Sequence, residues 1–98
     1  MTARPVARIG DADFPHASPM VRAVGSSDVF VNARPVSRQF DANTPHLVTP
    51  KGPVHISYIA VGSVTVFADS RGVGRILDLL IPVCTAVAQG SPTVFAGG

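Results

Sequence analysis

The sequence predicts an all-β domain in which three short β-hairpin repeats close around a pseudo-threefold axis. Two motifs support this fold class, because each occurs three times in the same order along the chain. The composition supports it as well: nine glycines and nine prolines divide 98 residues into short segments, and glutamate, a strong helix former, is absent. We therefore expect short strands and tight turns within a single domain spanning residues 1–98.

The first motif is Arg-x-Val-x-Arg-x-x-Asp, and a proline follows four residues after each aspartate. Its copies occupy residues 4–11, 34–41 and 71–78, and the prolines are Pro15, Pro45 and Pro82. We expect the arginines and aspartates to pair across neighbouring repeats. On a solvated surface such pairs contribute only ~0–1 kcal/mol each, so the fold is not expected to depend on them.

The second motif is Gly-Ser-x-x-Val-Phe, at residues 25–30, 62–67 and 90–95. The first two copies lead into the next copy of the first motif through Asn32 and Asp69, residues that suit a tight hairpin turn. The third copy has no partner after it. We expect residues 3–6 to pair with it, so that the first and last strands close the chain and leave few strand edges free.

Two sets of equivalent residues complete the expected core. Each repeat has a small residue at the same place, which suits a crowded symmetry axis, and each has one phenylalanine, which we expect to be buried. The small residues are Ala7, Ser37 and Gly74, and the phenylalanines are Phe30, Phe67 and Phe95.

The charge and the single cysteine exclude several classes of protein. The net charge is +2, and the eight basic residues form no run of the kind that binds nucleic acid or a membrane surface. One cysteine allows no internal disulfide. The N-terminal residues lack an apolar segment, so no signal peptide is expected. The longest apolar stretch, residues 76–88, is too short for a transmembrane helix.

Three histidines and the cysteine are the soft metal ligands of the chain. Each repeat contributes at least one at an equivalent place, in the segment between its aspartate and the next Gly-Ser. If these segments converge on the axis, His16, His46 and Cys84 would surround one point, with His55 as a fourth ligand. Such a donor set suits a tetrahedral zinc ion, and with no open position the site would be structural.

Other interpretations of these residues remain open. Three histidines are an ordinary number, a lone cysteine is usually a buried apolar residue, and no CxxC or HxxxH spacing is present. Cys84 beside a histidine could also resemble a thiol nucleophile, but nothing in the sequence supplies an oxyanion hole or an orienting carboxylate. Residues 72–74 lack the Gly-Lys-Ser/Thr end of a phosphate-binding loop. We therefore expect no enzymatic activity.

The repeats resemble those of the PAAR-repeat proteins, a family named after a Pro-Ala-Ala-Arg motif. The corresponding tetrapeptides here are Pro-Val-Ala-Arg at 5–8, Pro-Val-Ser-Arg at 35–38 and Gly-Val-Gly-Arg at 72–75, so the third has lost its proline. The resemblance covers essentially the whole chain. It implies a small cone with one structural zinc ion at its vertex, held by His16, His46, His55 and Cys84.

The resemblance also implies a function and a location. PAAR-repeat proteins cap the trimeric β-helical spike of phage tails, type VI secretion systems and related contractile injection machines. The chain would then be a structural, membrane-piercing tip, a monomer bound to a trimer, which meets a target membrane transiently. It would reside at a virion tail baseplate, or in the cytoplasm until it is secreted with the spike. The alternative is a generic zinc-stabilised β module that binds another protein without piercing.

Overall fold

The computed structural model describes residues 3–82 and 84–98, and in this part of the chain the regular structure is all β. Ten strands of two residues form five antiparallel pairs, and no helix there is long and apolar enough to cross a membrane. The strands are β1 (Arg4–Pro5), β2 (Phe30–Val31), β3 (Arg34–Pro35), β4 (His46–Leu47), β5 (Val54–His55), β6 (Tyr58–Ile59), β7 (Phe67–Ala68), β8 (Arg71–Gly72), β9 (Leu80–Ile81) and β10 (Phe95–Ala96).

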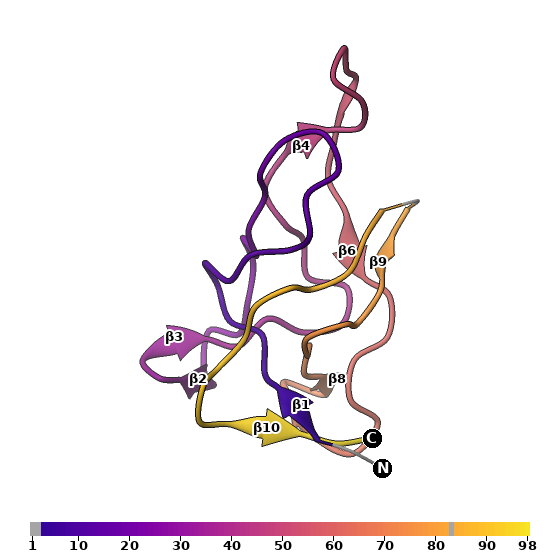
Figure 1. Ribbon diagram of the computed structural model, residues 1–98. Helices are drawn as coiled ribbons and strands as arrows, with labels where there is room; N and C mark the ends of the chain where they lie inside the picture. The colour runs from indigo at the N-terminus through magenta and orange to yellow at the C-terminus, as the bar shows by residue number, and fades with distance from the viewer. Residues whose placement is uncertain (1–2, 83) are drawn as a thin grey trace.

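The domain has the shape of a cone (Figure 1). Its principal extents are 38 × 27 × 23 Å. Strands β1, β2, β3, β8 and β10 lie at the wide end, and β4 lies toward the narrow end. The expected fold class, a small all-β cone, is confirmed.

Three hairpins form the wide end, as the repeats predict. In the β2–β3 and β7–β8 hairpins both turn residues have positive φ, at 54° and 63° for Asn32 and Ala33 and at 53° and 66° for Asp69 and Ser70. Two such residues make a type I′ turn, whose twist matches that of the strands. The third hairpin joins the two ends of the chain, because Arg4 of β1 lies opposite Ala96 of β10. The expected closure is confirmed.

A ring of backbone hydrogen bonds surrounds the pseudo-threefold axis. The amide of Ala7 donates to the carbonyl of Gly74 (2.8 Å), that of Gly74 to Ser37 (2.8 Å), and that of Ser37 back to Ala7 (3.0 Å). All three residues are buried. Because the ring brings three Cα atoms close together, only small side chains fit, and the expectation of a crowded axis is confirmed.

The phenylalanine prediction is wrong. Phe30, Phe67 and Phe95 are 53%, 56% and 52% exposed. Successive residues of a strand point to opposite faces, and in β7 and β10 it is the alanine after the phenylalanine that is buried. The wide-end core is instead small and aliphatic, and consists of Val6, Val36, Ala68, Val73 and Ala96. A second cluster toward the narrow end consists of Ala7, Met20, Ile59, Leu80 and Val87.

The ion pairs are only partly as expected. The first arginine of each motif does reach the aspartate of another repeat, at 2.8–2.9 Å, in the pairs Arg4–Asp78, Arg34–Asp11 and Arg71–Asp41. The second arginine instead pairs within its own motif, in Arg8–Asp11, Arg38–Asp41 and Arg75–Asp78. The expected surface location is wrong, because the shared aspartates are at most 4% exposed. Each is thus a buried acceptor joining two repeats.

Asp41 illustrates the bonding of these aspartates. It accepts hydrogen bonds from the backbone amide and the guanidinium of Arg38 and from Nη2 of Arg71. The bonds to Asp41 raise the pKa of Arg38, against the opposing effect of burial. Removing one partner of a buried pair usually costs about 3–5 kcal/mol, far more than a surface pair contributes.

The missing proline of the third motif also has a structural reason. A Cβ atom at Gly72 would overlap the backbone carbonyl oxygen of Ser63. The chain passes too close at this point for any side chain, and glycine is the residue without one.

The axis yields a first prediction. A Cβ atom on Gly74 would overlap Cδ1 of Ile59, so we expect Gly74→Ala to lower the free energy of unfolding by about 1–3 kcal/mol. Gly97→Ala is the matched control, because nothing lies within 4 Å of a Cβ atom there. Chemical denaturation measures both. Adding Ile59→Val, which removes Cδ1, should restore part of the loss; equal stability of the two alanine variants would contradict the crowded axis.

The shared aspartates yield a second prediction. Asp41→Asn should destabilise the domain by about 3–5 kcal/mol, because it removes the buried carboxylate that Arg38 and Arg71 share and leaves Arg38 only its pair with Asp69. Asp28→Asn, at an exposed aspartate that forms no ion pair with the described residues, should change stability little. Urea unfolding curves compare the two variants. A small effect for both would mean that the buried ion pairs do not hold the repeats together.

Candidate metal centre

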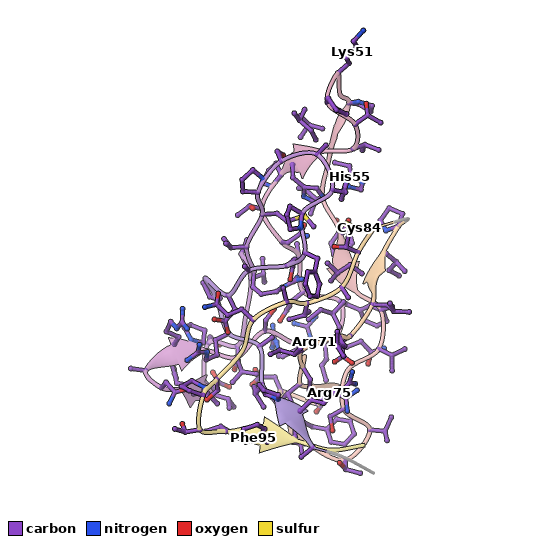
Figure 2. The ribbon with its side chains drawn as sticks, viewed as in Figure 1. Lys51, His55, Arg71, Arg75, Cys84 and Phe95 are labelled. Atoms are coloured by element: carbon purple, nitrogen blue, oxygen red, sulfur yellow. The ribbon has the colours of Figure 1, made fainter. Side chains whose placement is uncertain are left out.

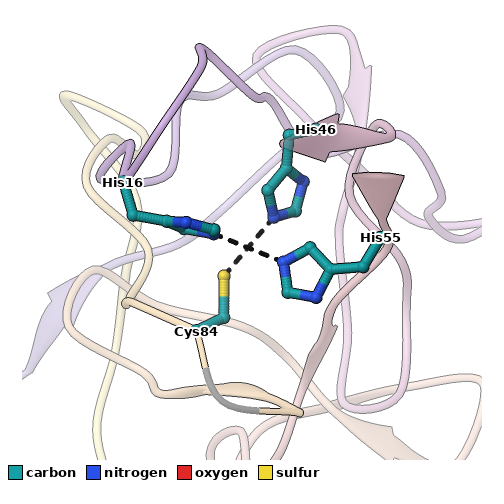
Figure 3. Close-up of side chains that lie close together, drawn as sticks. All are labelled: His16, His46, His55 and Cys84. Carbon is teal, nitrogen blue, oxygen red and sulfur yellow. Dashed lines mark hydrogen bonds between the residues drawn. The ribbon is translucent and has the colours of Figure 1, made fainter. Parts of the chain in front are cut away.

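Three segments, here called the ligand loops, carry the candidate ligands: residues 12–24, 42–61 and 79–89. They bring His16, His46, His55 and Cys84 together, with one ligand atom of each within 4.8 Å of all the others (Figure 3). All four residues expected to meet do so. The second loop supplies two of them, as its extra histidine predicts.

The second loop positions its two histidines by strand pairing. Strands β4 and β5 are antiparallel, and His46 lies directly opposite His55. Directly opposite residues project to the same side of a pair, so both rings reach the same point. Their nine-residue separation is bridged by a tight turn, in which the amide of Val48 donates to Pro53 (2.9 Å) and that of Gly52 to Thr49 (2.9 Å).

Backbone carbonyls fix which ring nitrogen faces the cluster. Nδ1 of His46 lies 2.8 Å from the carbonyl of Thr44, and Nδ1 of His16 lies 2.9 Å from that of Val48. Only a protonated Nδ1 can donate to a carbonyl. In the neutral ring Nε2 then keeps its lone pair and is free to bind a metal, which is the arrangement that supports ligating histidines in general.

The ligand atoms themselves face one another. Nε2 of His55 lies 3.3 Å from Nε2 of His16, and Sγ of Cys84 lies 3.5 Å from Nε2 of His46 (Figure 3). The three rings have centroids 4.4–5.3 Å apart and interplanar angles of 69–82°, so they surround a point rather than stack. The cluster could therefore hold a metal ion.

The surroundings of His55 favour its neutral ring. The pKa of His55 is lowered, first by desolvation and then by the nearby His46 and His16. A histidine with a lowered pKa binds its proton less tightly, so its nitrogen remains available at a lower pH than usual.

The three ligand loops are also tied to one another directly. Besides its bond to His16, the second loop donates the Leu47 amide to Oγ of Ser18 in the first loop (2.9 Å). The third loop meets the first at Phe14, whose amide donates to the carbonyl of Ala86 (2.9 Å). The cluster thus sits on a frame of inter-loop hydrogen bonds.

A buried polar network lies at the foot of the loops, and the repeat analysis missed it. Nη1 of Arg22 donates to Oδ2 of Asp13 (3.0 Å), which also accepts from Nδ2 of Asn43 (3.0 Å). Arg22 reaches the axis as well, through Oγ of Ser37 (3.2 Å). Burial raises the pKa of Asp13, and the charge of Arg22 opposes that rise. One signal was available: Arg22 is the only arginine outside the repeated motif.

Asp13 and Asn43 occupy equivalent places, each three residues before a ligand histidine. Their hydrogen bond, together with the bridge between Arg22 and Asn43, joins the first and second loops just below the cluster. In the third repeat Leu80 takes this place and is buried. The network therefore sets the spacing of the two loops that carry all three histidines.

The cluster yields a third prediction. We expect the purified chain to bind one Zn²⁺ ion, used as the probe, and to melt at a much lower temperature after chelation, because metal binding contributes directly to folding. Cys84→Ser should weaken binding and remove most of that dependence. Val54→Ser is the matched control, since Val54 neighbours His55 but is 60% exposed and offers no ligand. A melting temperature unchanged by chelator and by Cys84→Ser would contradict the metal site.

Comparisons with known proteins identify no family for this chain, so the site is interpreted from its geometry alone. A scan against protein-family models gives no match, and a search of curated proteins gives none. The structure itself shows a small all-β cone whose ligand loops gather three imidazoles and one thiol around a point that could hold a metal ion.

Proposed function

We propose that this chain is the zinc-bound tip of a membrane-piercing spike, which caps the trimeric β-helical spike of a contractile injection machine. The observation that carries the proposal is the wide end of the cone. Its three hairpins are related by pseudo-threefold symmetry, and each presents one half-exposed aromatic side chain: Phe30, Phe67 and Phe95.

A threefold partner explains this arrangement. Exposed aromatic side chains are common anchors of protein interfaces, and a trimer offers three identical sites around one axis. A monomer with three equivalent hairpins can place one phenylalanine against each subunit. The exposure of these three phenylalanines therefore supports the proposal, because side chains expected inside the domain are available to a partner.

The donor set supports zinc as the metal. Two atoms bound to one tetrahedral zinc ion lie about 3.3–3.4 Å apart for two nitrogens and about 3.6 Å apart for nitrogen and sulfur. The pairs at 3.3 and 3.5 Å match these edges. The widest separation between two ligand atoms is up to 4.8 Å, so side-chain rotations would have to move these atoms about 1 Å closer together to bind one ion. Imidazoles and a thiolate favour zinc over the hard cations magnesium and calcium.

Zinc in this site would be structural. Three nitrogens and one sulfur complete a tetrahedron and leave no position for a reacting water, which a catalytic site keeps. A cavity of about 260 Å³ lies among the described residues, and none of the four ligands lines it. Its lining consists of Ala60, Val61, Arg75, Leu77, Asp78 and Leu79. We accordingly propose no enzymatic role.

A piercing role requires a tip that does not splay under load, and the architecture supports it. The wide end is closed by pairing of the first and last strands. At the narrow end the zinc ion, when bound, would join all three ligand loops at one point. The proposed place of the chain is at the end of the spike, on a tail baseplate or in the cytoplasm until the spike is secreted.

The fourth prediction tests the partner. Mixed with the trimeric β-helical spike of a contractile machine from the same organism, the zinc-loaded chain should form a complex of one chain per spike trimer, as read by native mass spectrometry. Phe67→Ser should weaken binding about tenfold or more, as loss of an aromatic anchor does.

Phe40→Ser is the matched control, because Phe40 is 58% exposed, close to the 56% of Phe67, but lies outside the three wide-end hairpins. It should leave binding unchanged. Three chains per trimer, or equal effects of the two variants, would contradict docking through the wide end. Tight binding of an unrelated monomeric protein would favour the generic interaction module instead.

A further inference from the structure

The narrow end of the cone extends beyond the metal centre. The turn between β4 and β5 carries Lys51, which lies farther along the cone than His55 and Cys84 (Figure 2). The ligand cluster was expected at the vertex, but the hairpin tip extends beyond it. The residues of this turn therefore determine which surfaces the narrow end can bind.

Lys51 differs from every other basic residue of the chain. All seven arginines form ion pairs with aspartates within the described residues, and Lys51 forms none there. No acidic residue occurs from residue 42 to residue 68, so nothing in this segment neutralises it. The one uncommitted cation of the described chain stands at the tip. The proposed zinc ion, with neutral imidazoles and one thiolate, adds further positive charge below.

The same tip exposes an aliphatic side chain on a fixed backbone. Val54, the first residue of β5 after the turn, is 60% exposed. The turn is held by the two backbone hydrogen bonds already described and by Oγ1 of Thr49, which donates to the carbonyl of Gly52 (2.5 Å). Because the turn is already ordered, a contact made there costs little additional conformational entropy.

We propose that the β4–β5 hairpin is the membrane-contacting element of the chain, in which Lys51 binds the headgroups of anionic phospholipids while Val54 enters the interface. Charge complementarity carries this choice: a single unpaired ammonium, with an exposed valine beside the turn and no carboxylate in the segment, matches a negatively charged surface that is apolar beneath its headgroups. The inference rests on the proposed function only for its biological setting. The lipid contact itself depends on the hairpin alone.

The fifth prediction uses the zinc-loaded chain and vesicles of phosphatidylcholine, with or without phosphatidylglycerol, in low-salt buffer. Flotation should show binding that is about fivefold stronger to the vesicles that contain phosphatidylglycerol. Lys51→Gln should lower the partition coefficient about fivefold, the factor expected for one lysine at an anionic surface, and Lys51→Arg should preserve it. Added salt should reduce the difference between wild type and Lys51→Gln.

Two matched controls localise the contact. Ser27→Asp also lowers the net charge by one, but at an exposed residue just before β2 at the wide end, and should leave partitioning nearly unchanged. Val54→Ser should weaken binding, whereas Val64→Ser, at a residue of similar exposure (62%) outside the tip, should not.

Two results would overturn the proposal. Equal losses for Ser27→Asp and Lys51→Gln would assign the binding to net charge rather than to the tip. Loss on Phe67→Ser with none on Lys51→Gln would assign it to the wide end. Because the spike complex is measured separately, a chain that binds the spike but not the vesicles would leave the proposed function intact and remove only this inference.

Discussion

The ring of three backbone hydrogen bonds at the axis is the constraint on which the rest of the structure depends. It joins Ala7, Ser37 and Gly74, and it forces the three repeats to meet at the same height. Once they do, each buried aspartate lies between arginines of two repeats, and the first and last strands lie side by side. The ring also directs three ligand loops toward the narrow end, where the cluster forms. A domain of this size buries little apolar surface, so closure and shared polar contacts take on much of the stabilisation.

The pseudo-threefold symmetry holds at the wide end and is broken on the narrow-end side of the axial ring. Equivalent places there are occupied by Arg22, Ile59 and Val87, all fully buried, and the first of them requires the charge of Asp13 beside it. A buried ion pair adds little stability over apolar packing, but its directional bonds can fix geometry. Here Oδ2 of Asp13 accepts from both Arg22 and Asn43, and so links the two loops that carry the histidines. The symmetric end thus presents three equivalent hairpins, while the asymmetric end gathers three histidines and one cysteine around a single point.

The repeats made much of this predictable from the sequence. They indicated the three hairpins, the pairing of the chain ends, the small axial residues and the convergence of His16, His46 and Cys84. The exposure of the phenylalanines could not be predicted, because strands of two residues are too short to show an alternating pattern. The opposition of His46 and His55 depends on strand register, which the linear spacing does not reveal. Likewise, the sharing of each aspartate by two arginines becomes visible only when the repeats are closed into a ring.

The central claim is that one zinc ion joins all three ligand loops, and X-ray absorption spectroscopy of the zinc-loaded chain tests it most directly. The account predicts a four-coordinate ion with three nitrogen neighbours at about 2.0–2.1 Å and one sulfur at about 2.3 Å. A spectrum without a sulfur neighbour would show that the third loop is not joined to the others. More than four light-atom neighbours would place the ion elsewhere and contradict the account.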